Sequence, residues 1–285
     1  MKELFLLKCC INQHRNPFWI IILFAFIFLG FMGGVASPQL SFYVSPPLLE
    51  IDQVGGGVKN FTVEISNTGQ EKILVKTSYS DILLSSDGKV ELIRPLGTTP
   101  HTLASWIITK QDETTSLESG EIKRVLFQLR VPRGERGGRY GVIVFEALPF
   151  TIPQGKVALG IRSGTLVFLT IPRTEEIKGT IDDVISSTDG KEFKVTFKNT
   201  GNIHYETEGS LIIKSNDGKV LHRIRFPEDK PSLILPQGKR EFTILWDKKD
   251  PLLDGKYILE IRMSAWVGIR TLNLSRKVVE IEVKN

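Results

Sequence analysis

The sequence has almost no cysteine. Cys9 and Cys10 are adjacent, precede a long apolar run, and are followed by no further cysteine. The chain after residue 10 therefore has no disulfide framework, thiolate metal site or catalytic thiol. It also does not look like a lipoprotein, because neither cysteine follows the apolar run.

Catalytic and metal-binding motifs are also absent. Of the four histidines, His14 lies near the amino terminus, and the other three have no nearby acidic residue at a recognised catalytic or metal-ligand spacing. The glycines at 55–57 precede a strand pattern, whereas a phosphate loop needs a strand before the glycines and a helix after them. We therefore expect no enzymatic activity, no metal and no cofactor.

Charge of one sign is not concentrated anywhere. The formal net charge is +5, and removal of a leader carrying Lys2, Glu3, Lys8 and Arg15 would leave 34 basic and 31 acidic residues. No basic stripe with interleaved aromatic residues appears, so we expect no nucleic-acid partner.

Near the amino terminus, residues 18–36 form an uncharged apolar run preceded by Lys2, Lys8 and Arg15. This charge distribution predicts a cytoplasmic amino terminus and an exported remainder. The run of 19 residues (36 − 18 + 1) lies between a signal-peptide core and a spanning helix. Small residues at Gly34 and Ala36 suit a signal peptidase, so residues 1–37 are either a cleaved signal peptide or a retained hydrophobic membrane helix.

Residues 61–69 (FTVEISNTG) alternate apolar and polar side chains and end in residues that tolerate turns, which predicts a half-buried strand. The phrase returns at residues 193–201 (FKVTFKNTG), an offset of 199 − 67 = 132. Residues 87–90 (DGKV) return at 217–220, and a Gly-basic-Tyr phrase at 138–140 returns at 255–257. Such a long repeat indicates two tandem domains rather than a solenoid.

About seven short strand patterns occur in each half, and no helical periodicity persists between residues 38 and 172. The fold class we predict is all-β: two tandem immunoglobulin-like β-sandwiches over residues 38–172 and 179–285, joined by a charged link at 173–178. The short link favours a fixed or hinged pair over free tethering. Asp-Gly turns at residues 189–190, 217–218 and 254–255 favour antiparallel pairing.

The first half resembles the amino-terminal immunoglobulin-like domain of PapD-like periplasmic pilus-assembly chaperones. The resemblance lies in residues 61–69, 105–107 (SWI), 117–120 (LESG) leading to 125–131, and 166–172. The two-domain arrangement, with residues 137–145 (GGRYGVIVF), also resembles exported cell-surface proteins that partner wall-attached WxL-domain proteins. The resemblance implies an extracytoplasmic protein partner.

One departure concerns the basic pair with which pilus chaperones hold the carboxylate of their subunit. No arginine or lysine occurs from residue 38 to 54, and the expected lysine position near the last strand holds Thr165. The nearest upstream basic residue is Arg162. The chaperone's activity therefore cannot be transferred on these residues.

Two candidate binding segments remain. Val157, Leu159 and Ile161 alternate with small residues beside Arg162, so they either form a partner-facing strand edge or face their own core. The loop at 133–139 carries Arg133, Arg136 and Arg139 among glycines, and it is either a solvated hairpin or a contact for an acidic polymer or lipid head groups.

These observations predict an exported, non-enzymatic protein-binding module of the bacterial cell envelope, located in the periplasm or at the cell surface. One alternative is a periplasmic chaperone that binds surface-fibre subunits by β-strand donation. The other is a membrane-tethered surface adaptor for a cell-wall protein or glycan, which requires an uncleaved leader.

Overall fold

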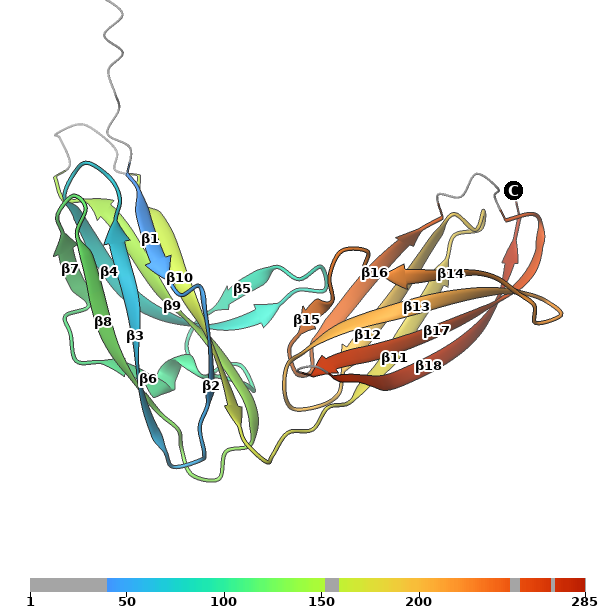
Figure 1. Cartoon of the computed structure of the whole chain (residues 1–285), viewed down its shortest axis with the longest axis horizontal. Coiled ribbons are helices and arrows are strands. Elements are labelled where there is room, and N and C mark those ends of the chain that lie inside the picture. The colour runs from blue at the N-terminus through green and yellow to red at the C-terminus, as the bar shows by residue number, and fades with distance from the viewer. Residues whose placement is uncertain (1–39, 152–158, 247–251, 268–269, 285) are drawn as a thin grey trace, which may run out of the picture. The chain divides into compact units, whose positions relative to one another are not determined.

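The computed structural model describes residues 40–151, 159–246, 252–267 and 270–284. In these ranges the regular structure is β-strand except for one 3-10 turn, Ala104–Trp106. Figure 1 shows β1–β10 gathered in one sandwich and β11–β18 in another, which confirms the predicted all-β, two-sandwich fold. The leader lies outside the described residues, and within the described ranges no helix is long and apolar enough to cross a membrane.

The strands of the first sandwich are β1 (Phe42–Ser45), β2 (Leu48–Asp52), β3 (Val58–Asn67), β4 (Ile73–Leu84), β5 (Val90–Ile93), β6 (Ile107–Thr109), β7 (Thr114–Leu117), β8 (Ile122–Arg130), β9 (Gly137–Pro149) and β10 (Ile161–Ile171). Their two sheets have the orders β1-β3-β8-β6 and β2-β10-β9-β4-β5, with β7 added to β4. An immunoglobulin domain pairs strands A-B-E-D in one sheet and G-F-C in the other. The first sandwich has this arrangement, with β3, β4, β8, β9 and β10 as B, C, E, F and G.

The strands of the second sandwich are β11 (Gly179–Ser186), β12 (Glu192–Asn199), β13 (Tyr205–Ser215), β14 (Val220–Phe226), β15 (Ser232–Ile234), β16 (Lys239–Leu245), β17 (Gly255–Val267) and β18 (Arg270–Val283). The sheet orders are β11-β12-β16 and β14-β13-β17-β18, with β15 on β13. This is again an immunoglobulin-like order, A-B-E against C′-C-F-G.

The expectation of antiparallel pairing is wrong for the strand β2. β1 pairs antiparallel with β3, whereas β2 pairs parallel with β10, from Leu48 opposite Leu166 to Asp52 opposite Thr170. Pro46 and Pro47 separate β1 from β2, and a proline cannot donate a ladder hydrogen bond. The amino-terminal segment therefore leaves one sheet at the prolines and continues along the last strand of the other sheet.

Some local predictions also change. We expected a strand at residues 105–108, but residues 105–106 lie in the 3-10 turn and the strand β6 begins only at Ile107. The short strands β5, β7 and β15 were not predicted, because each is only three or four residues long. A run of that length carries too little alternation to be recognised.

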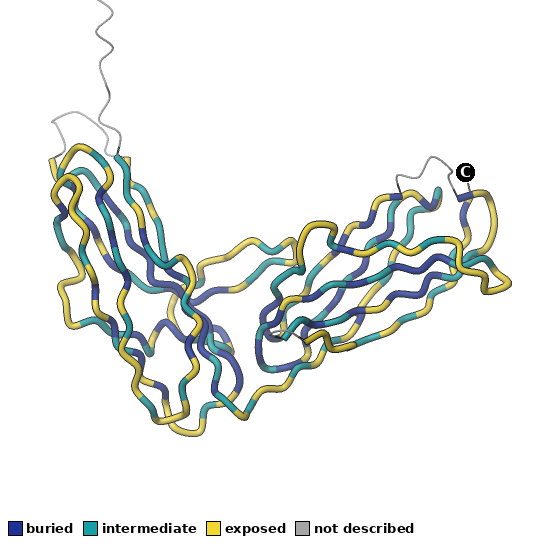
Figure 2. The backbone as a smooth tube through the Cα atoms, in the orientation of Figure 1, coloured by how far each residue is buried: buried dark blue, intermediate teal, exposed yellow. Residues whose placement is uncertain are grey.

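Each sandwich has its own apolar core. In β12, Phe193, Val195 and Phe197 are fully buried and alternate with half-buried residues. In β3, the fully buried Val63 and Ile65 alternate with more exposed residues. Figure 2 shows this alternation of buried and more exposed residues along the strands. The predicted period of two is thus realised at both copies of the repeated phrase.

The repeated asparagine has the same structural role in both sandwiches. The side chain of Asn67 is fully buried; its Oδ1 accepts a hydrogen bond from Gly69 N (3.0 Å), and its Nδ2 donates to the carbonyls of Glu71, Leu117 and Glu118 at 2.7, 3.2 and 3.0 Å. The Asn67 side chain therefore stabilises the turn that follows β3 and connects it by hydrogen bonds to the distant loop at residues 117–118.

In the second sandwich, the fully buried Asn199 accepts from Gly201 N (2.9 Å) and donates to the carbonyls of Ile203 (2.8 Å) and Ile234 (3.4 Å). The backbone of the motif makes matching contacts in both sandwiches. Gly120 N donates to the Asn67 carbonyl, and Gln237 N donates to the Asn199 carbonyl. The offset 237 − 120 = 117 equals that of the Gly-basic-Tyr phrase, so the duplication extends to non-local hydrogen bonds.

A buried carboxylate lies in the second sandwich on β17. Glu260 is 1% exposed, and its carboxylate receives Lys214 Nζ (2.7 Å), Arg262 Nε (2.7 Å) and Arg276 Nε (2.9 Å). Hydrogen bonds from Arg276 and Lys214 hold the pKa of Glu260 well below its ordinary value of 4.5. Burial of this charged group is tolerated because three basic side chains donate hydrogen bonds to its carboxylate.

We expect the second sandwich to lose stability as the pH falls below 4.5, the ordinary pKa of Glu260. Because the folded pKa is lower than the unfolded one, the unfolded chain takes up the proton first, and the stabilisation present at higher pH is lost on acidification. Thermal unfolding followed from neutral pH to about pH 3 should therefore show a smaller shift for Glu260→Gln than for the wild type. Equal shifts in the two proteins would contradict this assignment.

Candidate functional site

The first half of β10 has an open edge. From Ile161 to Ile171 the strand pairs with β9 on one side, but on the other side β2 covers only Leu166–Thr170. Among the described strands, none pairs with residues 161–165 on that side. An open strand edge presents unpaired backbone groups that another extended chain can pair with.

The register identifies which backbone groups face outward. Leu166 N donates to the Pro47 carbonyl (2.9 Å), on the side away from β9. Because hydrogen-bonding direction alternates along a strand, the N–H and C=O groups of Arg162 and Gly164 face the same side as those of Leu166. The open edge therefore offers two residues in the correct phase for strand addition.

The side chains expected to face a partner lie in different environments. Leu159 is 82% exposed, Ile161 is half-buried, and the exposed Arg162 forms an ion pair with Glu146 on β9 (2.9 Å). Val157 lies outside the described residues. The exposure of Leu159 is compatible with a partner-facing role and not with a place in the core, while the partner contact itself stays a prediction.

Thr165 is the last residue of the open edge, next to the part of β10 that β2 covers. Its side chain is fully buried, and Oγ1 donates to the Pro46 carbonyl (2.8 Å) beside the amino-terminal segment. On β2, the residue opposite Phe168 is the acidic Glu50. This region therefore contains the buried hydroxyl of Thr165 and the carboxylate of Glu50. Neither group can form the charge-assisted hydrogen bonds with which an arginine or a lysine holds a carboxylate ligand.

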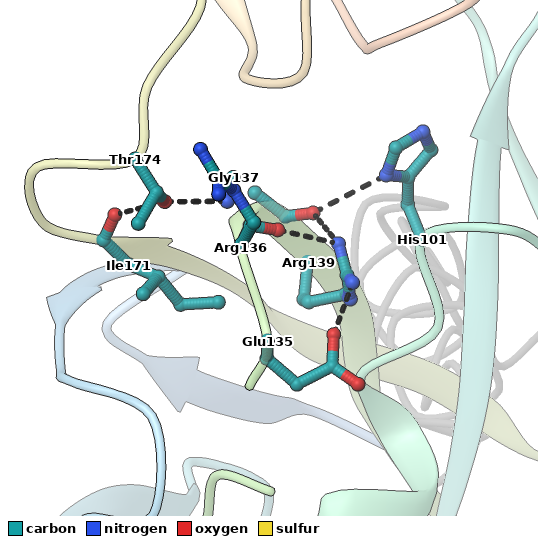
Figure 3. A network of polar contacts seen from close by, with 8 residues as sticks. His101, Glu135, Arg136, Gly137, Arg139, Ile171 and Thr174 are labelled. Atoms are coloured by element: carbon teal, nitrogen blue, oxygen red, sulfur yellow. Dashed lines mark hydrogen bonds and ion pairs between the residues drawn. The ribbon is translucent and has the colours of Figure 1, made fainter. Parts of the chain in front are cut away.

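The arginine loop is partly used within the protein. Arg139 forms an ion pair with Glu135, donates to the carbonyls of Arg136 (3.0 Å) and Gly138 (2.9 Å), and lies 5.7 Å from the ring of Trp106. Figure 3 shows its guanidinium pointing into this network. Of the three arginines singled out in the sequence, only Arg133 and Arg136 are exposed and remain available as a surface contact.

The same network ties the loop to the link after β10. Gly137 N donates to Thr174 Oγ1 (2.7 Å), and this hydroxyl donates to the Ile171 carbonyl (2.7 Å), as Figure 3 shows. Glu176 N donates to Asn202 Oδ1 (2.6 Å), and Asn202 Nδ2 donates to the Thr174 carbonyl (2.8 Å). Residues of the predicted link at 173–178 therefore form hydrogen bonds both with Gly137 at the start of β9 and with Asn202.

Sequence reasoning did not find a buried aromatic group around Tyr140. The Tyr140 hydroxyl accepts from His204 N (2.7 Å), and the His204 ring packs edge-on against Tyr140 and Phe168. Burial lowers the pKa of His204 although Nε2 lies 3.4 Å from Glu50 Oε1, and burial raises the pKa of Tyr140. No sequence signal could reveal this group, because Glu50, Tyr140 and His204 are far apart in the chain.

Among the described residues, no three histidine, cysteine, aspartate or glutamate side chains converge as they would around a metal ion.

No protein-family model matches the sequence, and no curated protein matches it significantly. Among solved structures, the class 5 fimbriae chaperone CfaA is 12% identical with a TM-score of 0.48, covering 86% of this chain and 100% of that one.

The CsuC–CsuE chaperone–tip adhesion subunit pre-assembly complex of Acinetobacter baumannii contains a chain that is 13% identical with a TM-score of 0.46, covering 86% of this chain and 100% of that one. The complex of Salmonella enterica SafA pilin with the SafB chaperone contains a chain that is 11% identical with a TM-score of 0.44. The match covers 87% of this chain and 99% of that one. At this level of similarity we transfer no activity, ligand or partner. These three structures contain fimbrial chaperones, alone or in complex with a subunit.

Proposed function

We propose that the protein is an exported, non-enzymatic binding module of the cell envelope that captures an extended segment of another protein at the open edge of β10. The observation that carries this proposal is the edge itself. Among the described strands, only β9 pairs with residues 161–165, and the neighbouring Leu159 is 82% exposed. Strand addition would obtain affinity from backbone hydrogen bonds and specificity from side chains such as Leu159 and Ile161.

Export is supported by the apolar run at residues 18–36 and the basic residues before it. The finer proposal is that the captured segment belongs to a surface-fibre subunit, so that the protein acts as an assembly chaperone. The absence of a basic anchoring pair means that such a segment would be held by its backbone and apolar side chains. Amino-terminal sequencing of the native protein distinguishes a free periplasmic chaperone, which starts at Ser37, from a tethered surface adaptor, which keeps the leader.

The role of the edge can be tested with three variants of the full chain, each tagged and recovered from the envelope of the source cells. Leu159→Lys adds a charge beside the edge, and Arg162→Pro removes an outward-facing N–H, which an edge strand tolerates. Each should lower recovery of the partner identified with the wild type by about tenfold, equivalent to roughly 1.4 kcal/mol.

Arg162→Ala is the matched control, because it removes the same side chain and keeps the backbone donor. It should retain the partner, and circular dichroism should show all three variants folded. If Arg162→Pro is folded and still recovers the partner at the wild-type level, strand addition at β10 is rejected. If Leu159→Lys unfolds the protein, Leu159 belongs to the core and not to a binding edge.

A further inference from the structure

The outer face of the sheet β14-β13-β17-β18 collects arginines that are distant in the sequence. Leu211, Ile213, Leu259 and Ile261 on β13 and β17 point into the core, so the residues between them point outward. Strand register then places four residues in one row across the four strands. In order they are Arg225, Ser210, Arg262 and Arg276, each directly opposite the next.

The row places like charges side by side. Arg262 and Arg276 are cross-strand neighbours, an arrangement that is destabilising without compensation. The compensation comes from the buried Glu260, whose Oε1 accepts from the Nε atoms of both arginines. One carboxylate thus holds two guanidinium groups in place, and the arginine side chains remain 52% and 61% exposed.

Two further arginines extend the positive charge. Arg225, at the end of the row, is 75% exposed and pairs with Glu208 (3.2 Å), and Arg223 occupies the adjacent row on β14. The donors to the buried Glu260 carboxylate are Lys214, Arg262 and Arg276, and neither Arg223 nor Arg225 is among them. Their positive charge can therefore be removed without disturbing that group.

Acidic residues border the row on both sides. On β13, Glu208 lies two residues from Ser210 and so occupies the next row on one side. On β18, Glu280 lies four residues from Arg276, two rows away on the other side. A two-dimensional anionic surface, such as a bilayer or a broad acidic protein face, would meet these carboxylates as well as the arginines. A linear anion lying across the strands would meet the arginines and pass between the acidic borders.

We propose that this row binds a soluble linear polymer that carries phosphate groups. Three steps between neighbouring strands give the row a length of about 14 Å, longer than a single small anion. The guanidinium group matches the geometry of phosphate oxygens and can donate two parallel hydrogen bonds to them. The site is on the second sandwich, and it stands independently of strand addition at β10.

The proposal is tested by titrating the full chain with linear sodium polyphosphate of defined length and with orthophosphate. Polyphosphate should bind saturably at low salt, with an affinity that falls as salt rises. Arg223→Gln combined with Arg225→Gln should weaken binding by at least about tenfold. The slope of log affinity against log salt should shrink by about 1.4, the value for two contacts on a single-stranded polyanion.

The matched control is Arg124→Gln on β8 of the first sandwich. Arg124 is 78% exposed and paired with Glu64, much as Arg225 is paired with Glu208. It should leave polyphosphate binding unchanged. An equal loss with Arg124→Gln, equal affinity for orthophosphate, or no saturable binding would overturn the proposal. Tighter binding to vesicles of anionic phospholipid than to polyphosphate would reassign the row to a membrane surface, and equal binding of polyglutamate would remove the preference for phosphate.

Discussion

Replacing Asp81 with alanine should lower the free energy of unfolding by about 3–5 kcal/mol. Asp81 is fully buried on β4, and its carboxylate accepts hydrogen bonds from Gly97 N (2.8 Å), Thr102 Oγ1 (2.8 Å), Leu103 N (3.3 Å) and Ala104 N (3.2 Å). The substitution leaves these donors without their acceptor. The Leu103 and Ala104 N–H groups are buried, and each buried unsatisfied donor costs about 1–3 kcal/mol. Chemical denaturation followed by tryptophan fluorescence would measure the loss.

Asp87→Ala provides the control for this change, because Asp87 lies in an exposed hairpin turn and bonds mainly to its neighbours Ser85 and Lys89. It should lower the free energy of unfolding by much less than Asp81→Ala does, because an exposed carboxylate contributes little. If the Asp81 and Asp87 variants are equally stable, the buried carboxylate does not organise the loop at residues 97–104.

Removing the repeated asparagines should destabilise the two sandwiches separately. Asn67→Ala and Asn199→Ala should each cost about 2–4 kcal/mol, because each deletes a buried amide and leaves backbone carbonyls of distant loops without a donor. Hydrogen exchange read by mass spectrometry should show faster exchange in β1–β10 for Asn67→Ala and in β11–β18 for Asn199→Ala.

The control for this pair is Asn60→Ala on β3, where the asparagine is exposed and accepts a hydrogen bond from Gln128 (3.2 Å). It should change neither stability nor exchange by a comparable amount. Equal acceleration across both sandwiches in either variant would show that the motif does not act within its own sandwich.

The fold could be predicted where the signal is local. The alternation at residues 61–65 and 193–197 follows from the geometry of a strand, and the Asn-Thr-Gly phrase after it marks a turn. The parallel pairing of β2 with β10 could not be predicted in this way, since those strands are more than 100 residues apart (166 − 48 = 118). Pairing partners depend on how the two sheets close, which no local pattern records.

The candidate sites show the same division. The sequence named Leu159, Ile161 and Arg162, but it could not say that β2 stops short of them and leaves the edge open. It also drew attention to Arg133, Arg136 and Arg139 because they are close in the chain, whereas Arg139 is engaged with Glu135.

By itself the sequence determined the longer strands, their buried faces, the turns and the repeated phrases, since these depend on the order of side chains over a few residues. Only the tertiary structure decided which backbone edge stays uncovered and which charges become neighbours. Arg225 and Arg276 are 51 residues apart (276 − 225) and share one row only because the register of four strands aligns them. The physical reason is that cross-strand neighbours are set by long-range hydrogen bonding, which a linear pattern does not encode.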